Sequence, residues 1–314
     1  MMAALQSPLG TVKAVFAVLA ISLNTVVMTS SLYLCSLARW FAGSESARGR
    51  VRRFLAHLAE TWIACNNVIL SLYRRPQWDI QLPGGLRRDG CYMVSCNHRS
   101  WVDILVLQRC FNRRLPLLRF FIKRELLRVP FLGLAWWLLD FPVMRRDSRP
   151  AAARGPGPRG HDLERARIAC EKFRDIPVAM MNFPEGTRFS IGKRDRAQAP
   201  YANLLAPRIG GTGQVLYALG DQLDSLIDVT IVYPKADGRA GSPTFWQLLS
   251  GSVPRIVARV RRLEIPDTLL GRDFRSDPVF RRDLEAWMTE LWREKDALIS
   301  SLLAAPPPAS RAAA

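Results

Sequence analysis

Apolar residues are distributed differently in three successive parts of the chain. Residues 14–38 contain no charged side chain, whereas residues 51–73 place apolar side chains at helical spacing between arginines. From residue 77 onward, short apolar runs of strand length alternate with longer stretches of helical periodicity. This alternation predicts an α/β fold with a central, mostly parallel or mixed sheet flanked by helices.

Local patterns also predict the individual elements of this α/β region. Strands are expected at residues 78–82, 91–96, 118–122, 139–144, 176–183, 226–233 and 255–265. Helices are expected at residues 101–111, 125–139 and 163–174. A final helix should begin at Pro278 behind Asp277 as its N-cap. We expect its apolar stripe to pack against the domain through Phe280, Leu284, Trp287, Leu291 and Leu298.

The uncharged run at residues 14–38 is long enough for a membrane helix. A bilayer core needs roughly 20 apolar residues in a helix, and this run has 25. A signal peptide would have a shorter apolar region of roughly 7–15 residues and a small-residue cleavage site, whereas Arg39, Trp40 and Phe41 follow here. We therefore expect residues 1–44 to form a retained membrane segment. Asn24, in its middle, leaves open a re-entrant insertion instead of a complete span.

Charge around this segment predicts its orientation. Only Lys13 precedes the run, whereas Arg39, Arg48, Arg50, Arg52 and Arg53 follow it. The positive-inside bias therefore places the rest of the chain on the cytoplasmic side. The arginine- and alanine-rich composition favours a bacterial protein, and hence the bacterial inner membrane.

Residues 45–76 are expected to form an amphipathic linker helix. Its apolar stripe consists of Phe54, Leu55, Leu58, Trp62, Cys65, Ile69 and Leu72. Two interpretations remain open: the helix lies in the lipid headgroup layer, or it packs against the core. The α/β domain with its last helix then covers residues 77–303, and residues 304–314 lack apolar periodicity and should be disordered.

Composition narrows the function only slightly. The chain has 45 basic and 27 acidic residues, for a formal charge of +18, and nearly all the basic residues are arginines. Such a surface would attract nucleic acid, anionic lipid or phosphorylated substrates. The six cysteines form no CxxC pair and no metal-like spacing with histidine. We therefore expect reduced thiols, a cytoplasm-like compartment and no metal site.

The stretch SCNHRSWVD carries the first candidate chemistry. Ser100 and Asp103 have the spacing of a helix-capping box, in which case His98 would be an ordinary loop residue. Alternatively, His98 in the turn before the helix meets Asp103 in its first turn. A carboxylate on one imidazole nitrogen leaves the other nitrogen free to accept a proton. Without a serine nucleophile, such a pair suits a hydroxyl that arrives with the substrate.

Two further turns carry candidate anion-binding groups. The stretch FPEGTR places Glu185, Gly186, Thr187 and Arg188 directly after a buried strand, where they form either an ordinary turn or an oxyanion site. The stretch FPVMRR places Arg145 and Arg146 at the end of another strand, where arginines are more often solvated than functional.

Taken together, these stretches resemble the glycerolipid acyltransferase family of the 1-acylglycerol-3-phosphate type. NHRSWVD matches its NHxxxxD motif, and FPEGTR matches its FPEGT/SR motif. Asp103 of the first motif and Glu185 of the second lie 82 positions apart. FPVMR and DVTIVYP (228–234) occupy the places of the two remaining motifs, although Met144 replaces the usual acidic or polar residue before the arginine. The resemblance covers residues 77–234. The stretches YANLLAPRIGG and DVTIVYP are closer to the lysocardiolipin and lysophospholipid acyltransferase branch.

This resemblance implies roles for the candidate residues. His98 would be the general base and Asp103 its partner. Arg145, Glu185, Gly186, Thr187 and Arg188 would bind the phosphate of the acceptor, with Glu185 orienting either Arg188 or a backbone turn. Backbone N–H groups near the helix start are expected to hold the oxyanion. The acyltransferase fold implied is an α/β sheet of the glycerol-3-phosphate acyltransferase type with an N-terminal membrane helix.

The implied reaction transfers a fatty acyl group from a thioester, acyl-CoA or acyl carrier protein, to the hydroxyl of a lysophospholipid such as 1-acyl-sn-glycerol-3-phosphate. It needs membrane lipids around it, no metal or other cofactor, and no nucleic acid. Residues 129–139 would line the acyl path, lie against lipid or be buried in the core. A glycerol-3-phosphate acyltransferase and a non-enzymatic basic membrane adaptor remain alternatives.

Overall fold

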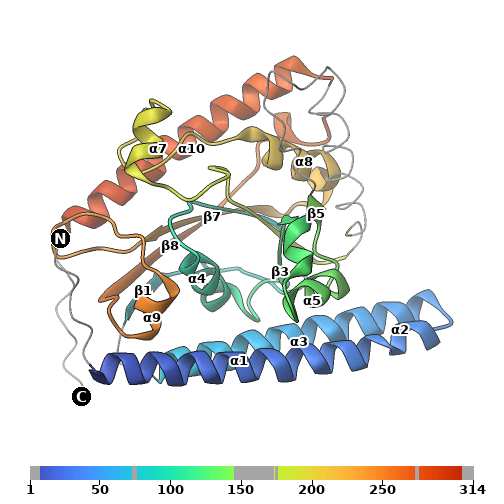
Figure 1. The fold of residues 1–314 in the computed structure, drawn as a ribbon. Helices are drawn as coiled ribbons and strands as arrows, with labels where there is room; N and C mark the ends of the chain where they lie inside the picture. Colours follow the sequence, from blue (N-terminus) through green and yellow to red (C-terminus); the bar gives the residue numbers. More distant parts are fainter. Residues whose placement is uncertain (1–7, 73–75, 145–172, 174–175, 273–275, 306–314) are drawn as a thin grey trace.

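A mixed six-stranded sheet forms the centre of the molecule (Figure 1). The computed structural model describes residues 8–72, 76–144, 173, 176–272 and 276–305. The sheet contains β1 (Gln77–Gln81), β2 (Cys91–Cys96), β3 (Leu118–Phe120), β6 (Val178–Asn182), β7 (Ser225–Val232) and β8 (Arg255–Leu263), in the order β1-β8-β7-β2-β6-β3. All neighbours are parallel except β7 and β8. The α/β prediction with a mostly parallel or mixed sheet is confirmed.

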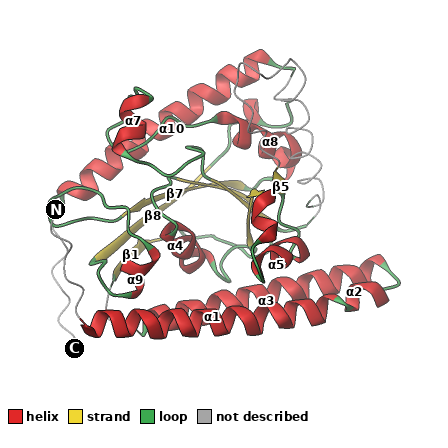
Figure 2. Ribbon diagram, in the orientation of Figure 1, coloured by secondary structure: helices red, strands yellow, loops and turns green. Residues whose placement is uncertain are grey.

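Helices cover both faces of this sheet (Figure 2). The α-helices are α1 (Pro8–Ser36), α2 (Ala38–Phe41), α3 (Glu45–Ser71), α4 (Val102–Phe111), α5 (Leu132–Leu138), α7 (Ile191–Arg196), α8 (Ile209–Leu219), α9 (Phe245–Leu249) and α10 (Pro278–Ala304). Short 3-10 helices are η1 (Arg124–Arg128), η3 (Gly220–Gln222) and η4 (Asp267–Leu269). A separate pair of short parallel strands consists of β4 (Ile122–Lys123) and β5 (Val143–Met144).

The strict alternation of side chains along β2 separates two apolar clusters. Tyr92, Val94 and Cys96 face the cluster that contains α4, the start of α1 and α9. Cys91 and Met93 face the opposite cluster, which contains α8 and α10. Every residue of β2 is buried, as expected for the middle strand of a sheet that is covered on both faces.

Three expected elements are divided or shortened. The run at 118–122 divides between β3 and β4, and only Val143–Met144 of the run at 139–144 is a strand. The helix expected at 125–139 breaks into η1 and α5 around Pro130. Proline disfavours helical backbone at the preceding residue and lacks an N–H donor, so the helix restarts at Leu132.

The last helix begins as expected. The Asp277 side chain accepts a hydrogen bond from the Phe280 N–H, and Pro278 occupies the first turn. The buried stripe differs from the expected one, however, because it includes Lys295 and Trp292 and leaves Trp287 only half-buried. Lys295 is fully buried because its ammonium group meets Asp228 and the Val229 carbonyl on β7.

The N-terminal helices form a hairpin that lies along one side of the α/β domain (Figure 1). Asn24 donates hydrogen bonds to the Trp62 carbonyl and to the Asn66 Oδ1 atom of α3, so it joins the two helices. The face of α3 that packs differs from the expected stripe: Leu55, Ala59 and Ile63 are buried, whereas Phe54 and Leu72 are exposed.

Several expectations fall outside the described residues. These are the strand end with Arg145 and Arg146, the helix at 163–174 apart from Phe173, and the tail from residue 306. Of the cysteines, the five that the structure describes are all free thiols, as expected, namely Cys35, Cys65, Cys91, Cys96 and Cys110.

Candidate active site

The candidate site lies where the carboxyl ends of the parallel strands β7, β2 and β6 meet. Beyond the end of β2, the Asn97 side chain donates to the Ile231 carbonyl and accepts from the Ile231 N–H. These two bonds continue the β2–β7 ladder by one more step and fix the turn that holds His98. The crevice at the carboxyl ends of the strands is where open α/β sheets generally bind ligands.

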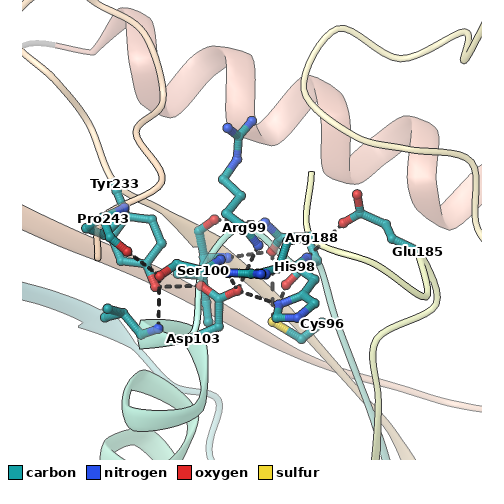
Figure 3. Close-up of polar contacts among 12 residues, drawn as sticks. Cys96, His98, Arg99, Ser100, Asp103, Glu185, Arg188, Tyr233 and Pro243 are labelled. Atoms are coloured by element: carbon teal, nitrogen blue, oxygen red, sulfur yellow. Dashed lines mark hydrogen bonds and ion pairs between the residues drawn. The ribbon is translucent and has the colours of Figure 1, made fainter. Parts of the chain in front are cut away.

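His98 and Asp103 meet across this turn (Figure 3). The His98 Nδ1 atom lies 2.8 Å from Asp103 Oδ2. The same Oδ2 accepts hydrogen bonds from the Arg99 and Ser100 N–H groups, at 2.7 and 2.8 Å. Asp103 therefore forms one half of the expected capping box by accepting from the Ser100 N–H, while Ser100 Oγ accepts from the Val102 N–H and not from that of Asp103. The same carboxylate contacts the imidazole, so His98 is not an ordinary loop residue.

Hydrogen bonds and stacking orient the His98 ring. It stacks on Phe183 with ring centroids 3.9 Å apart and an angle of 18° between the planes. Its side chain is 15% exposed, whereas Asp103 is fully buried. When Nδ1 donates to a carboxylate, the neutral ring carries its lone pair on Nε2. This arrangement suits proton abstraction by Nε2.

Glu185 orients a backbone turn and not Arg188. Its Oε1 atom accepts from the His98 N–H at 2.8 Å, and its Oε2 atom accepts from the Leu205 N–H at 2.9 Å. The carboxyl group is buried, and this desolvation raises its pKa from 4.5 to about 7. Glu185 therefore supports the site from behind, and its oxygens face backbone donors.

In the rest of the FPEGTR turn, Gly186 and Thr187 are half-buried and Arg188 is exposed. Gly186 has a φ of +68°, which favours glycine. Lys193 of α7 donates to the Thr187 hydroxyl at 2.7 Å and to the Arg188 carbonyl at 2.9 Å. The Arg188 guanidinium lies 5.2 Å from the centre of the Trp101 ring. The turn thus places one cation, Arg188, over an aromatic ring, and a second cation, Lys193 of α7, holds the turn.

Several contributing residues were not predicted from the sequence. Tyr233 donates a hydrogen bond to Asp103 Oδ1 at 2.5 Å. Arg99 is buried, stacks over Phe189 at 4.5 Å and donates to the Asn203 carbonyl. Both residues lie within the stretches NHRSWVD and DVTIVYP, so their position in those motifs was the only available signal. Arg145, which the sequence placed in the phosphate site, lies outside the described residues.

Three N–H groups near the helix start are already occupied. Those of Arg99 and Ser100 bind Asp103, and that of His98 binds Glu185. These three groups are therefore not available to hold an oxyanion. Within the described residues, no group of three or more His, Cys, Asp or Glu side chains is arranged to hold a metal ion.

Two cavities adjoin the turn that carries the His–Asp pair. The basic cavity, of about 320 Å³, is lined by Arg99, Ser100, Trp101, Arg188, Phe189, Ser190, Lys193, Ser242, Pro243, Thr244 and Phe245. The apolar cavity, of about 380 Å³, lies between the hairpin, α4 and α5. Trp101 and Phe245 line both cavities, so the two cavities are neighbours with a shared wall.

The apolar cavity includes part of residues 129–139. Leu132, Trp136 and Leu139 line it, whereas Phe131 and Trp137 are exposed on the outside of α5. Ala135 and Leu139 also belong to a buried apolar cluster. This segment therefore combines a cavity wall, an exposed apolar surface and burial in the core.

Comparisons with known proteins agree with these motifs. Residues 80–205 match the family model described as Acyltransferase. Lysocardiolipin acyltransferase 1 of Danio rerio is 27% identical over 260 residues, which cover 79% of this chain and 61% of that protein. The 2-acyl-1-lysophosphatidylinositol acyltransferase of Saccharomyces cerevisiae is 24% identical over 246 residues, covering 66% of this chain and 60% of that protein.

The chain thus spans about three fifths of the length of these two relatives. The crystal structure of the 1-acyl-sn-glycerophosphate (LPA) acyltransferase PlsC from Thermotoga maritima is also similar, with a TM-score of 0.47 at 16% identity. That similarity covers 88% of this chain and 97% of the other. Residues 80–205, which match the Acyltransferase family model, include His98, Asp103 and Glu185.

Proposed function

We propose that this protein transfers a fatty acyl group from a thioester to the free hydroxyl of a lysophospholipid. One observation carries the proposal: the turn that holds the His98–Asp103 pair also lines a basic cavity, which shares Trp101 and Phe245 with an apolar cavity. A lysophospholipid has the same division, with an anionic headgroup joined to an apolar chain. The relatives named for lysocardiolipin and lysophosphatidylinositol acyl transfer support this class of acceptor.

The proposed reaction needs one base and two well-placed substrates. The acceptor oxygen attacks the thioester carbonyl carbon while His98 Nε2 takes the hydroxyl proton. The carbon–sulfur bond of the tetrahedral intermediate then breaks, and His98 returns the proton to the departing thiolate. Because a thioester is already activated, positioning and general base catalysis suffice for the transfer.

Arg188 and Lys193 supply the positive charge for the acceptor phosphate. Both line the basic cavity and both are exposed, so a phosphate could reach them without dehydrating a buried cation. Arg99 lines the same cavity, but its guanidinium group donates to the Asn203 carbonyl and stacks over Phe189. The cavity is larger than a phosphate and carries hydroxyl groups of Ser190, Ser242 and Thr244, which favours an acceptor with a further polar group on its phosphate.

We also propose that the N-terminal hairpin lies in the plane of the membrane. Residues Pro8–Phe41 are long and apolar enough to cross a bilayer, and only 17% of the most apolar window is buried. However, the α/β domain holds both ends of α1. Ala14 and Ala17 pack in the cluster that contains α9, while the Tyr33 hydroxyl and Arg39 donate to carbonyls of α5. A perpendicular span would draw α5 and α9 into the lipid.

An in-plane hairpin would place the cavities at the lipid surface. Exposed apolar residues of α1 and α2, among them Phe16, Leu23, Trp40 and Phe41, would enter one leaflet. The arginines of α3 would lie at the headgroups, each contributing about 1 kcal/mol on an anionic surface. The proposed location is the cytoplasmic face of a bacterial inner membrane.

Product analysis tests the reaction. Purified protein is offered acyl-CoA or acylated carrier protein, with lysophosphatidate, lysophosphatidylglycerol, lysophosphatidylinositol or glycerol-3-phosphate, and the products are identified by mass spectrometry. We expect diacyl phospholipid from at least one lysophospholipid. His98→Ala should lower the rate by about 10²–10⁴-fold, whereas His57→Ala on the exposed side of α3 should not.

Three results would contradict the proposal. Acylation of glycerol-3-phosphate alone would assign the first acylation step instead. Full activity of His98→Ala would remove the histidine from the reaction. The absence of any transfer, together with lipid binding that depends only on surface arginines, would favour the non-enzymatic adaptor.

Flotation with anionic vesicles tests the hairpin. Trp40 and Phe41 are each 88% exposed, and burying such a side chain contributes about 1.5–3 kcal/mol. The Trp40→Ser/Phe41→Ser double variant should therefore bind vesicles at least about tenfold more weakly. Val279→Ser, on α10 across the sheet from the hairpin, is the control and should bind normally. Unchanged binding of the double variant would contradict the in-plane arrangement.

A further inference from the structure

Tyr233 reaches the candidate site from the end of a different strand. It follows β7 directly and lies on the same face as Val229 and Ile231, within the cluster that contains α4. The two hydrogen bonds between Asn97 and Ile231 hold this end of β7 against the turn of His98. Since strand residues two positions apart share a face, this register directs the Tyr233 ring toward α4.

The Tyr233 hydroxyl donates to the oxygen of Asp103 that His98 does not use. Tyr233 OH lies 2.5 Å from Asp103 Oδ1, whereas His98, Arg99 and Ser100 share Oδ2 (Figure 3). Burial raises the pKa of the Tyr233 phenol well above its usual value, so the phenol keeps its proton and remains a donor. Tyr233 itself is 2% exposed and Asp103 is fully buried, which excludes bulk water as a competing donor.

We propose that Tyr233 is a positioning residue that fixes the Asp103 carboxylate and limits how strongly it stabilises protonated His98. This inference rests on the proposed function, because it assumes that His98 accepts a proton during the reaction. Tyr233 does not touch the reacting atoms and acts only through Asp103. It keeps its own proton throughout, so the proton of the acceptor hydroxyl moves to His98 and then to the thiolate.

Two physical effects support this role. A second anchor on Oδ1 prevents the carboxylate from rotating away from the imidazole. In addition, a hydrogen bond to a buried carboxylate spreads its negative charge. Less negative charge then remains to stabilise an imidazolium ion.

Other charged groups near the pair cannot replace this donor. Among the described residues, those electrostatically coupled to Asp103 or Tyr233 are Cys96 on β2, Arg99 in the turn and Glu185 after β6. Burial raises the pKa of Cys96 well above its usual value, so it stays a neutral thiol. The Arg99 side chain donates to Asn203, and Glu185 accepts backbone hydrogen bonds. Tyr233 is therefore the side-chain donor assigned to Oδ1.

The test compares Tyr233→Phe with Tyr92→Phe in the full-length protein. Tyr92 is a matched control, since it is also buried and its hydroxyl accepts from the Arg87 N–H at the far end of β2. For Tyr233→Phe we expect kcat to fall about tenfold, as part of the general-base contribution, with KM for the lysophospholipid unchanged. The low-pH limb of the kcat/KM profile should move to higher pH. Tyr92→Phe should keep the wild-type profile.

A second variant tests the sign of the effect without removing the donor. Replacing Tyr233 by 3-fluorotyrosine keeps the shape of the ring and makes the hydroxyl a stronger acid, hence a stronger donor. The low-pH limb should then move to lower pH, opposite to the shift with phenylalanine. If Tyr233→Phe does not fold, the 3-fluorotyrosine variant alone tests whether Tyr233 acts on His98 through Asp103.

Specific outcomes would overturn the proposal. Wild-type pH profiles in both Tyr233 variants would exclude the positioning role, as would shifts in the same direction. A rise in KM alone, or a loss of kcat matched by an equal loss of folded protein, would assign Tyr233 to substrate binding or to packing. If wild-type protein transfers no acyl group, the proposed function fails instead, so the two failures are distinguishable.

Discussion

The Glu185 side chain binds the backbone of His98, although 87 positions separate the two residues: Glu185 Oε1 accepts a hydrogen bond from the His98 N–H at 2.8 Å. The second oxygen accepts from the Leu205 N–H. With both oxygens committed to backbone donors, this carboxyl group holds two loops together beneath the site. Glu185 therefore has a structural role, which explains why an acidic residue occurs in a stretch that was expected to bind phosphate.

Replacement of Glu185 by glutamine should destabilise the protein and flatten its pH dependence. A Gln amide has one acceptor oxygen, so one of the two N–H donors loses its partner at a cost of about 1–3 kcal/mol. In the wild type, burial raises the Glu185 pKa from 4.5 to about 7. The folded state therefore binds the extra proton, and this contribution to stability is fully present below pH 4.5 and lost as pH rises through about 7.

Thermal unfolding of both proteins between pH 4 and pH 8 checks this prediction. The contribution is on the order of 3 kcal/mol, since one pKa unit corresponds to about 1.4 kcal/mol. The stability difference between wild type and Glu185→Gln should therefore shrink as pH rises. Parallel stability curves would show that folding does not shift the pKa of Glu185.

Gly186→Ala should destabilise the FPEGTR turn. Gly186 has a φ of +68°, and an added Cβ would lie 3.3 Å from Arg208 Cδ. The left-handed backbone alone costs alanine about 1–2 kcal/mol, and we expect the melting temperature and the activity to fall together. Gly192→Ala is the matched control, because no atom lies within 4 Å of its added Cβ. It should be neutral or slightly stabilising, and equal effects of the two substitutions would contradict the assigned strain.

Arg188→Gln should weaken acceptor binding more than it slows the reaction. Arg188 lines the basic cavity with Lys193 and lies over Trp101. Charge-assisted hydrogen bonds contribute about 1.5–3 kcal/mol, so KM for the lysophospholipid should rise roughly 10–100-fold with a smaller change in kcat. Arg196→Gln removes the same charge from the exposed end of α7 and should leave KM unchanged. Equal KM values for the two variants would exclude a specific phosphate contact of Arg188.

Lys295→Met should destabilise the packing of α10 on the sheet. The Lys295 ammonium lies 2.6 Å from Asp228 Oδ1 as an ion pair and donates an aligned hydrogen bond to the Val229 carbonyl. Both side chains are fully buried. Breaking such a pair costs about 3–5 kcal/mol because the remaining charge stays buried. We expect a cost near the lower end of this range, because Arg261 also pairs with Asp228.

The Lys295→Met/Asp228→Leu double variant provides the comparison. Removing both charges eliminates the uncompensated carboxylate, so the double variant should be more stable than Lys295→Met alone. The free energies of unfolding in urea measure this difference. A double variant less stable than the single one would show that Asp228 contributes stability without Lys295, through its pair with Arg261.

Helix α3 illustrates where prediction from the pattern was wrong. Spacing alone selected a stripe beginning with Phe54, Leu55 and Leu58, but the buried face includes Ala59, Glu60 and Asn66. Asn66 is buried because Asn24 of α1 donates to it, and Glu60 because Arg88 lies 2.6 Å from its carboxylate. The face of an amphipathic helix that packs depends on the partner surface, and hydrophobic periodicity does not contain that information.

The His98–Asp103 contact and the strands of the sheet were determined by the sequence itself. The two site residues lie within one turn and the helix that follows, where local backbone geometry brings them together. Buried strands such as β2 must be apolar on both faces, so their composition identifies them. These are properties of neighbouring residues, which a linear pattern records.

Only the tertiary structure decided the partners of this pair and the spaces around it. Glu185 and Tyr233 reach the turn from β6 and β7 because the strand order places both strands beside β2. The apolar cavity exists because the hairpin of α1 and α3 packs across α4 and α5. Such contacts depend on which distant segments meet, and that follows from burying all the apolar faces of the elements at once.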